Sequence, residues 1–179
     1  MDKQYIINYE WSVSEGSSVQ FYRLIGYKNL GFKEFSGRKG KKKANFACAK
    51  QKQLSKLGLA PKVIGNVCKV KCVDKDMLFL SDWGYITQIA QTKEKYSMKE
   101  IQSLVDNIKE KAGLKFWDCH DYNIGILKVR GKNKLVCIDT GEESFDRECN
   151  AWGFREPGPK CVDCKKYNCD CCDYYCEED

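Results

Sequence analysis

Segments rich in aromatic and branched residues, and alternation of apolar and polar residues over 29–35, predict β-strands in the first 35 residues. We expect a first strand over residues 5–13, a second within 15–26 that opens with a turn, and a third over 29–35. The second and third strands form a predicted hairpin. The basic sequence SGRKGKKK (36–43) then predicts a loop, because glycines interrupt it twice.

The pattern next changes to a helical period. Apolar side chains at positions 46, 47, 49, 54 and 57 predict a helix over residues 45–58. Asn45 suits the N-cap, because its side chain can accept a hydrogen bond from the first helical turn. Gly58 suits the position just past the last turn, where a left-handed conformation is common.

Two further strands are expected after this helix, over residues 66–73 and 76–83. The polar residues Asp74, Lys75 and Asp76 predict the turn between them, and Gly84 is expected to end the second strand.

The strongest helix signal begins at Ser97. Ser97 and Glu100 have the S-x-x-E form of a capping box, and the following apolar residues share one face of a helix that ends at Gly113. After a polar loop come a basic turn (130–134) and an apolar strand, LVCIDTG (135–141). This order of strands and helices predicts an α+β fold.

Length and composition limit the class of protein. The chain has 179 residues, of which 42% are hydrophobic, enough for one compact domain with a core. No stretch approaches the roughly 20 apolar residues of a membrane helix, and the N-terminus has no basic segment followed by an apolar run. We therefore expect a soluble, intracellular (cytoplasmic) protein without a membrane partner.

Charge is distributed unevenly along the chain. Residues 1–140 carry 26 Lys and Arg against 14 Asp and Glu, whereas residues 141–179 carry 5 against 11. The basic part favours an anionic ligand, such as a nucleotide or a nucleic acid. A solvated basic face is the equally weighted alternative.

The 12 cysteines fall into two groups. Six are scattered through residues 48–149 and are expected to be reduced, small core residues. The other six lie in the last 19 residues, where Cys161 with Cys164 and Cys169 with Cys172 form two C-x-x-C pairs. Because Zn²⁺ prefers four thiolates in a tetrahedron, these four predict a zinc site. Disulfides, or a tail with neither zinc nor disulfides, are the alternatives.

Three residues near the end of the basic part have the spacing of a phosphate-handling site. Asn123 follows Asp118 by five residues, and an apolar strand then leads into Asp139, which is followed by Thr140 and Gly141. Carboxylate and amide oxygens are the ligands that Mg²⁺ prefers. A well-placed Asp can also orient or deprotonate an attacking hydroxyl. Ordinary turn residues are the alternative explanation.

This pattern resembles the protein-kinase-like superfamily, whose catalytic loop has the form H-R-D-x-x-x-x-N and is followed by D-F-G. WDCHDYN (117–123) is closer to the H-G-D-x-H-x-x-N loop of aminoglycoside and choline kinases, with His120 at the second His. The resemblance implies Asp118 as the catalytic Asp and Asn123 and Asp139 as magnesium ligands. It implies that His120 braces the loop, with metal binding or base catalysis as alternatives.

The resemblance extends more weakly to the first half. It implies that Gly16 covers the phosphates of ATP, that Lys33 binds them, and that FLSDWGY (79–85), with Asp82 and Trp83, meets the adenine. The helix over 45–58 corresponds to the kinase helix that presents a Glu to this Lys. Residues 35–93 contain no Glu, so either Gln51 or Gln53 is the expected substitute.

The implied fold has two lobes: an N-lobe-like part (1–84), a reduced C-lobe (85–155), and a Cys-rich tail (156–179). The expected function is ATP- and Mg-dependent phosphotransfer to an unidentified acceptor. The main alternative is a catalytically inactive pseudokinase that binds a protein or nucleic-acid partner through the basic part or the tail. A zinc-containing nucleic-acid-binding protein is a weaker alternative. The small size and reduced kinase pattern favour a viral origin by analogy.

Overall fold

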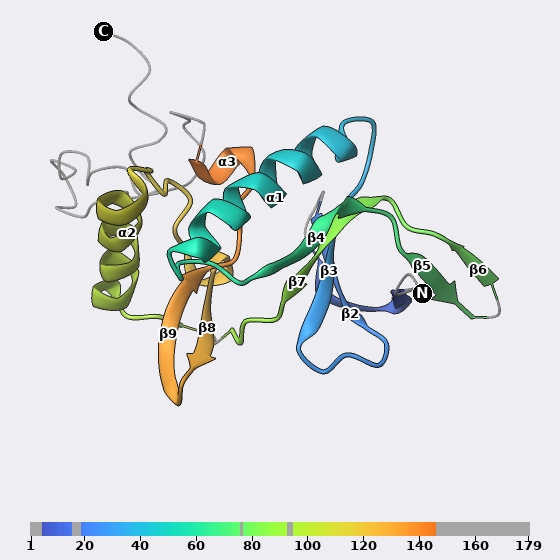
Figure 1. The fold of residues 1–179 in the computed structure, drawn as a ribbon, viewed down its shortest axis with the longest axis horizontal. Coiled ribbons are helices and arrows are strands. Elements are labelled where there is room, and N and C mark those ends of the chain that lie inside the picture. The colour runs from blue at the N-terminus through green and yellow to red at the C-terminus, as the bar shows by residue number, and fades with distance from the viewer. Residues whose placement is uncertain (1–4, 16–18, 76, 93–94, 146–179) are drawn as a thin grey trace, which may run out of the picture.

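A computed structural model describes residues 5–15, 19–75, 77–92 and 95–145 and has an α+β architecture (Figure 1). The described strands form a curled seven-stranded sheet and a separate two-stranded hairpin. The strands of the sheet are β1 (Ile6–Glu15), β2 (Val19–Leu24), β3 (Leu30–Phe35), β4 (Val63–Cys68), β5 (Lys71–Asp74), β6 (Met77–Leu80) and β7 (Trp83–Gln88). The other elements are α1 (Gly40–Lys56), α2 (Met98–Ala112), the 3-10 turn η1 (Asp121–Asn123), β8 (Ile124–Val129), β9 (Lys132–Cys137) and α3 (Glu142–Phe145).

The sheet has the order β4-β7-β3-β2-β1-β5-β6. All neighbouring strands run antiparallel except β1 and β5, which are parallel. The expected β2–β3 hairpin is confirmed, with Phe21 opposite Lys33. On its other side β3 pairs with β7, where Lys33 is opposite Tyr85. Lys33 therefore lies near the middle of the sheet, between two paired strands.

The first helix begins earlier than its sequence predicts. The predicted start and cap at Asn45 are wrong, because α1 begins at Gly40 and Asn45 is exposed within it. Lysine is a good helix former, so the basic run extends the helix rather than remaining in the loop. Gly40 also allows a close approach to β3, since a Cβ there would lie 2.2 Å from the Phe35 carbonyl oxygen. The predicted stop is confirmed by Gly58, whose φ is +67°.

Two strands were predicted over 66–73 and 76–83, and this number is wrong, because the structure has four strands, β4 to β7, over 63–88. Val70 leaves the ladder and donates its N–H to the Ser81 side chain, which separates β4 from β5 and β6 from β7. The predicted turn at Lys75 is confirmed by its positive φ of 51°. Gly84 does not end a strand. It lies within β7, where a Cβ would be 2.3 Å from the Lys33 carbonyl oxygen.

In the second half α2 follows its sequence prediction, but the strand expected over 135–141 and the turn expected over 130–134 have wrong bounds. β9 runs over Lys132–Cys137, because Val129 already pairs with Lys132 and only two residues are needed for the turn. Ser97 caps α2 in a complete capping box with Glu100, and Gly113 ends the helix in the left-handed conformation. β8 and β9 form a hairpin whose turn contains Arg130 and Gly131, both with positive φ. Apolar residues of α2 pack with the hairpin and the C-terminal end of α1, among them Leu54, Leu104, Ile108, Ile124 and Cys137.

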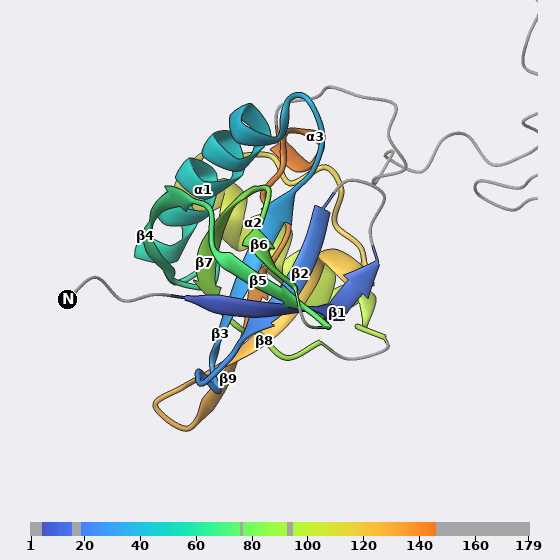
Figure 2. The same cartoon turned by 90° about the vertical axis from the view of Figure 1, so that its right-hand side faces the viewer.

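Helix α1 lies between the sheet and the α2–hairpin part (Figure 1). It contacts β3, β4 and β7 on one side and α2 and α3 on the other. The perpendicular view shows α3 close beside α1 (Figure 2). The expected boundary after residue 84 falls inside β7, and the tail over 156–179 lies outside the described residues. α1 thus positions the end of the β8–β9 hairpin against the sheet.

Five of the scattered cysteines are free thiols, and four of them, Cys48, Cys72, Cys119 and Cys137, are buried, as expected. Cys149 lies outside the described residues. Within the described ranges, each helix is too short or too polar to cross a bilayer.

Candidate functional site

An ion pair joins the seven-stranded sheet to the β8–β9 hairpin. The Lys33 Nζ atom lies 2.9 Å from Asp139 Oδ1, across 106 positions of sequence, and it also donates to the Ile138 carbonyl oxygen at 3.2 Å. The Lys33 side chain is 9% exposed and that of Asp139 is 30% exposed. The lysine is therefore buried, while the carboxylate still reaches solvent on one side.

The charge of each partner keeps the other ionised. Burial alone would raise the pKa of Asp139, but the Lys33 charge and three hydrogen bonds outweigh burial, so the pKa of this carboxyl lies below its ordinary value. Burial alone would lower the pKa of Lys33, but the Asp139 charge, the hydrogen bond to Asp139 and the nearby Tyr85 together outweigh burial, so the pKa is raised. At neutral pH the site therefore holds an ammonium group and a carboxylate.

Two further donors fix the orientation of the Asp139 carboxylate. The Gly141 amide donates to Oδ1 at 3.3 Å, and the Ser144 hydroxyl donates to Oδ2 at 3.2 Å. Ser144 is fully buried, and its carbonyl oxygen accepts the Trp117 amide at 3.0 Å. Ser144 therefore ties Asp139 to the residue that precedes Asp118. Sequence reasoning missed Ser144, because a Ser five residues after an Asp gives no local signal.

Asp118, His120 and Asn123 form one hydrogen-bonded loop. The Asn123 Nδ2 donates to the carbonyl oxygen and to Oδ2 of Asp118, each at 2.9 Å, and lies 3.0 Å from His120 Nε2. His120 Nε2 is also 3.4 Å from Asp118 Oδ1, and its Nδ1 accepts the Tyr122 amide. These contacts favour the expected bracing role of His120.

The loop is joined to the end of the hairpin through the backbone. The Ile138 amide donates to the Asn123 carbonyl oxygen at 2.9 Å, one residue beyond the Ile124–Cys137 pair. Asn123 and Asp139 are therefore neighbours at the open end of the hairpin. Within the described residues no donor bonds the Asn123 Oδ1 atom, which leaves this oxygen free to ligate a cation.

The middle residue of the Asp139–Gly141 motif anchors α1. The Thr140 hydroxyl donates to the Ala47 carbonyl oxygen at 2.9 Å and lies 3.4 Å from the Tyr85 hydroxyl, which donates to Gln51 Oε1 at 2.8 Å. Burial raises the pKa of Tyr85 to about 12, so its hydroxyl stays protonated. This buried network fixes α1 relative to Asp139.

The expected substitutes for the missing Glu do not contact Lys33. The Gln51 amide group instead donates to Thr87 and to the Pro61 carbonyl oxygen, and Gln53 is exposed. Gln51 is neutral and already bonded on both ends of its amide. Asp139 is thus the carboxylate partner of Lys33.

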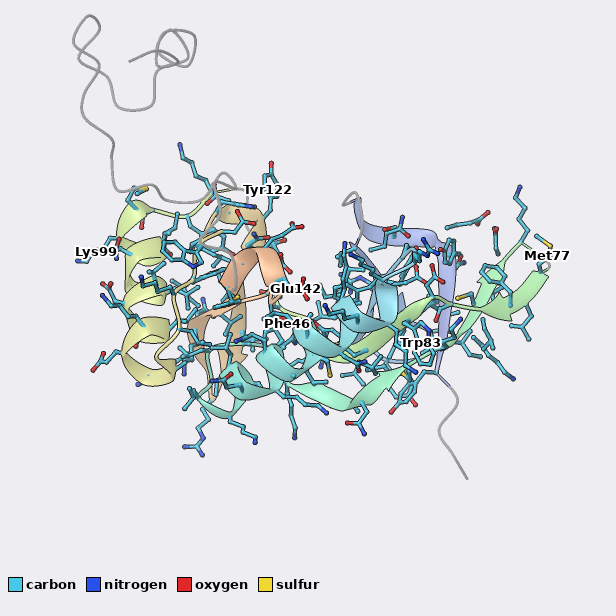
Figure 3. The ribbon with its side chains drawn as sticks, turned by 90° about the horizontal axis from the view of Figure 1, so that it is seen from above. Phe46, Met77, Trp83, Lys99, Tyr122 and Glu142 are labelled. Carbon is cyan, nitrogen blue, oxygen red and sulfur yellow. The ribbon has the colours of Figure 1, made fainter. Side chains whose placement is uncertain are left out.

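Asp82 and Trp83, two of the remaining predicted residues, have other contacts than this ion pair. Asp82 is exposed before β7, and its amide donates to the buried Glu34 carboxylate at 2.7 Å. Trp83 opens β7 and lies on the sheet side of the molecule, away from Tyr122 of the loop (Figure 3). Gly16 lies outside the described residues.

Glu34 is a second buried residue that sequence reasoning missed. It is fully buried, and the Tyr9 hydroxyl donates to it at 3.3 Å. Burial raises the pKa of this carboxyl, against the lowering effect of its hydrogen bonds. Since neighbouring strand residues point to opposite faces, Glu34 faces away from the Lys33 side. It holds the start of β7 in place.

The candidate metal ligands at the ion pair are oxygen atoms. No group of three or more His, Cys, Asp or Glu side chains is placed to hold an ion in the described ranges, and Cys161, Cys164, Cys169 and Cys172 lie outside them. Asn123 and Asp139 offer one amide oxygen and one carboxylate. That set fits Mg²⁺, which keeps several waters and takes further ligands from substrate phosphates.

A cavity of about 280 Å³ lies elsewhere, between α2 and β9, where Leu59, Leu104 and Leu135 line it with polar neighbours. None of the residues at the ion pair contributes to its wall.

The chain matches no protein-family model, and no curated protein matches it in sequence. The functional interpretation therefore depends on the geometry of Lys33, Asp118, Asn123 and Asp139.

Proposed function

We propose that this chain is an ATP- and Mg-dependent phosphotransferase with a two-lobed, protein-kinase-like fold and a reduced second lobe. The seven-stranded sheet with α1 corresponds to the first lobe. The second lobe consists of α2, the loop over 117–123 and the β8–β9 hairpin. Lys33, Asp118, Asn123 and Asp139 are the residues proposed to carry the reaction.

The observation that carries this proposal is the 2.9 Å contact between Lys33 and Asp139. The motif resemblance assigns both residues to the phosphates and metal of ATP, although 106 positions separate them. A chance match of short motifs gives no reason for these two side chains to meet. Their contact in a half-buried setting supports a shared role.

In the proposed complex Asn123 Oδ1 and the Asp139 carboxylate would hold Mg²⁺, which would supply positive charge to the phosphate oxygens. Lys33 lies within reach of the same phosphates and contributes a permanent positive charge. Ser144 and Gly141 hold the Asp139 carboxylate in one orientation, so little reorganisation is needed when the nucleotide binds.

In the proposed reaction Asp118 handles the proton of the acceptor hydroxyl. Its side chain is 20% exposed and is steered by Asn123 and His120. The acceptor hydroxyl oxygen forms a bond to the γ-phosphorus, the bond from that phosphorus to the bridging oxygen breaks, and ADP leaves. Asp118 accepts the hydroxyl proton.

Turnover of γ-labelled ATP by the full chain tests this assignment, with water as the default acceptor. Asp118→Asn should lower turnover by roughly 100-fold or more, because general base catalysis is worth about 10²–10⁴-fold, and should leave Mg-ATP affinity nearly unchanged. Asp106→Asn, an exposed change on α2, is the matched control. Equal turnover in wild type and Asp118→Asn would remove Asp118 from the mechanism.

The second candidate is a catalytically inactive, kinase-derived interaction protein. Gln51 favours it, because this side chain bonds Tyr85, Thr87 and Pro61 and leaves Lys33 without a carboxylate partner on α1. In that case Mg-ATP binding without measurable turnover is expected. Turnover that depends on Asp118 would exclude this alternative.

A further inference from the structure

Basic side chains gather at the N-terminal end of α1. We call this set the α1 basic surface, and it consists of Arg38, Lys39, Lys41, Lys42, Lys43 and Lys69. Five of them are exposed and Lys43 is half-buried. The first turn of α1 has no acidic residue, and none of the six forms an ion pair with a carboxylate in the described residues.

An aromatic side chain lies between two of these cations. The Lys41 Nζ is 4.3 Å from the centre of the Trp83 ring, and the Lys69 Nζ is 5.6 Å from it. Trp83 is half-buried and packs partly against the core beneath α1. An indole ring thus lies in contact with two flexible ammonium groups from different segments of the chain.

Among the described residues, this arrangement leaves the positive charge of the lysines without a paired carboxylate. Because Lys41 and Lys69 both contact one ring, their charges are within about 10 Å of each other, comparable to the Debye length of about 8 Å at physiological salt. Screening between them is therefore incomplete. A ligand with closely spaced negative charges would relieve this repulsion by taking the place of mobile counterions.

The Trp83 ring favours one class of negatively charged ligand over the others. Proteins that bind single-stranded nucleic acid combine a basic groove or face with aromatic rings on which bases stack. Here the Lys41 head group can move from the ring to a phosphate, which frees the indole face for a base. An anionic membrane or an acidic peptide could pair with the lysines but has no base to stack on the indole ring.

We propose that the α1 basic surface binds single-stranded nucleic acid, with phosphates on Lys41, Lys42 and Lys69 and one base against Trp83. The surface includes none of Lys33, Asp118, Asn123 and Asp139, the four residues proposed to carry phosphotransfer, although Trp83 also belongs to the segment expected to meet adenine. The lysine variants therefore test nucleic-acid binding separately from phosphotransfer, and either proposal can fail without the other.

Fluorescence anisotropy with a labelled 20-nucleotide oligo(dT) and the full chain tests the proposal. Affinity should fall as salt rises, with a slope of about −0.7 in log–log form for each phosphate contact. The triple variant Lys41→Gln/Lys42→Gln/Lys69→Gln should reduce the slope by about 2 and weaken binding at least 10-fold at low salt. Trp83→Leu should weaken binding by roughly 5- to 150-fold, the range for losing one stacked base.

A charge-matched control separates this surface from general charge. Lys99→Gln/Lys109→Gln/Lys128→Gln removes three exposed lysines from α2 and β8 and should bind almost as wild type. Circular dichroism melting verifies that each variant is folded. Equal losses in both triple variants would overturn the proposal, as would undetectable binding at low salt. Binding to phosphatidylserine vesicles or polyglutamate with the affinity seen for oligo(dT) would also overturn it.

Discussion

Removing the ammonium group of Lys33 tests how the two parts of the protein are held together. In Lys33→Met the side chain keeps most of its apolar length but no longer pairs with Asp139. The carboxylate then lies in a half-buried position with only the Gly141 and Ser144 donors. The variant therefore loses a charge-assisted hydrogen bond and leaves a charge without its counterion.

The expected cost follows from burial. Breaking a buried ion pair by removing one partner typically costs about 3–5 kcal/mol. Asp139 is 30% exposed and keeps two hydrogen bonds, so the expected loss is at or below the lower bound of that range, about 2–3 kcal/mol. Asp139→Asn should cost a similar amount, because it leaves the nearly buried Lys33 ammonium unpaired. The double variant Lys33→Met/Asp139→Asn should cost about 2 kcal/mol less than the sum of the two.

Urea unfolding at pH 7, followed by circular dichroism, measures these differences. Lys128→Met is the control, since Lys128 is exposed on β8, and its effect should stay within about 0.5 kcal/mol. Additive losses in the double variant would refute the reasoning, because they would mean that the two charges do not stabilise each other in the folded protein.

Three further predictions concern stability. Ser97→Ala should cost about 1 kcal/mol in urea unfolding, because it removes the side-chain acceptor of the α2 capping box, whereas Ser103→Ala on the exposed face of α2 should be nearly neutral. Gly84→Ala should cost about 2 kcal/mol or more, since its Cβ would meet the Lys33 carbonyl oxygen at 2.3 Å; an unchanged melting temperature would mean that β3 and β7 are less tightly packed. Because the folded-state pKa of Asp139 is lowered, its contribution is present above the ordinary Asp pKa of about 4 and is lost as pH falls through the folded value. The stability advantage of wild type over Asp139→Asn should therefore shrink below about pH 4, and a constant difference down to pH 2 would contradict this sign.

The parts of the fold that sequence predicts well are those specified by local chemistry. The capping box at Ser97 and the stop at Gly113 define α2 without reference to the rest of the chain. The β8–β9 hairpin brings Asn123 beside Asp139 through one local strand pairing. A hairpin predicted from the sequence therefore also predicts that these two residues are close. The motif resemblance added only the prediction of what they bind.

The misplaced elements depend on contacts between distant segments. Gly40 starts α1 because the helix approaches the Phe35 backbone, and Gly84 lies within β7 because that strand crosses close to Phe32 and Lys33. Both glycines look like breaks when only the sequence is considered. Their role becomes visible once the neighbouring strand is known.

The hydrogen-bond partners of the buried polar side chains could not be predicted from the sequence either. Gln51 or Gln53 of the helix was expected to replace the Glu that pairs with Lys33. Gln51 instead forms hydrogen bonds with Tyr85 and Thr87. Glu34 is fully buried, but a charged residue in a strand gives no sequence signal of burial. Burial of a polar side chain is set by tertiary packing, so periodicity alone cannot assign it.

The most direct test of the proposed nucleotide site is calorimetric titration of the full chain with ATP, with and without Mg²⁺. We predict measurable binding that requires Mg²⁺, that is lost in Asp139→Asn, and that is retained in the control Asp106→Asn. Absence of ATP binding by the folded wild type, or Mg-independent binding of equal strength in Asp139→Asn, would contradict the assignment of Asn123 and Asp139 as the magnesium ligands of a phosphotransferase.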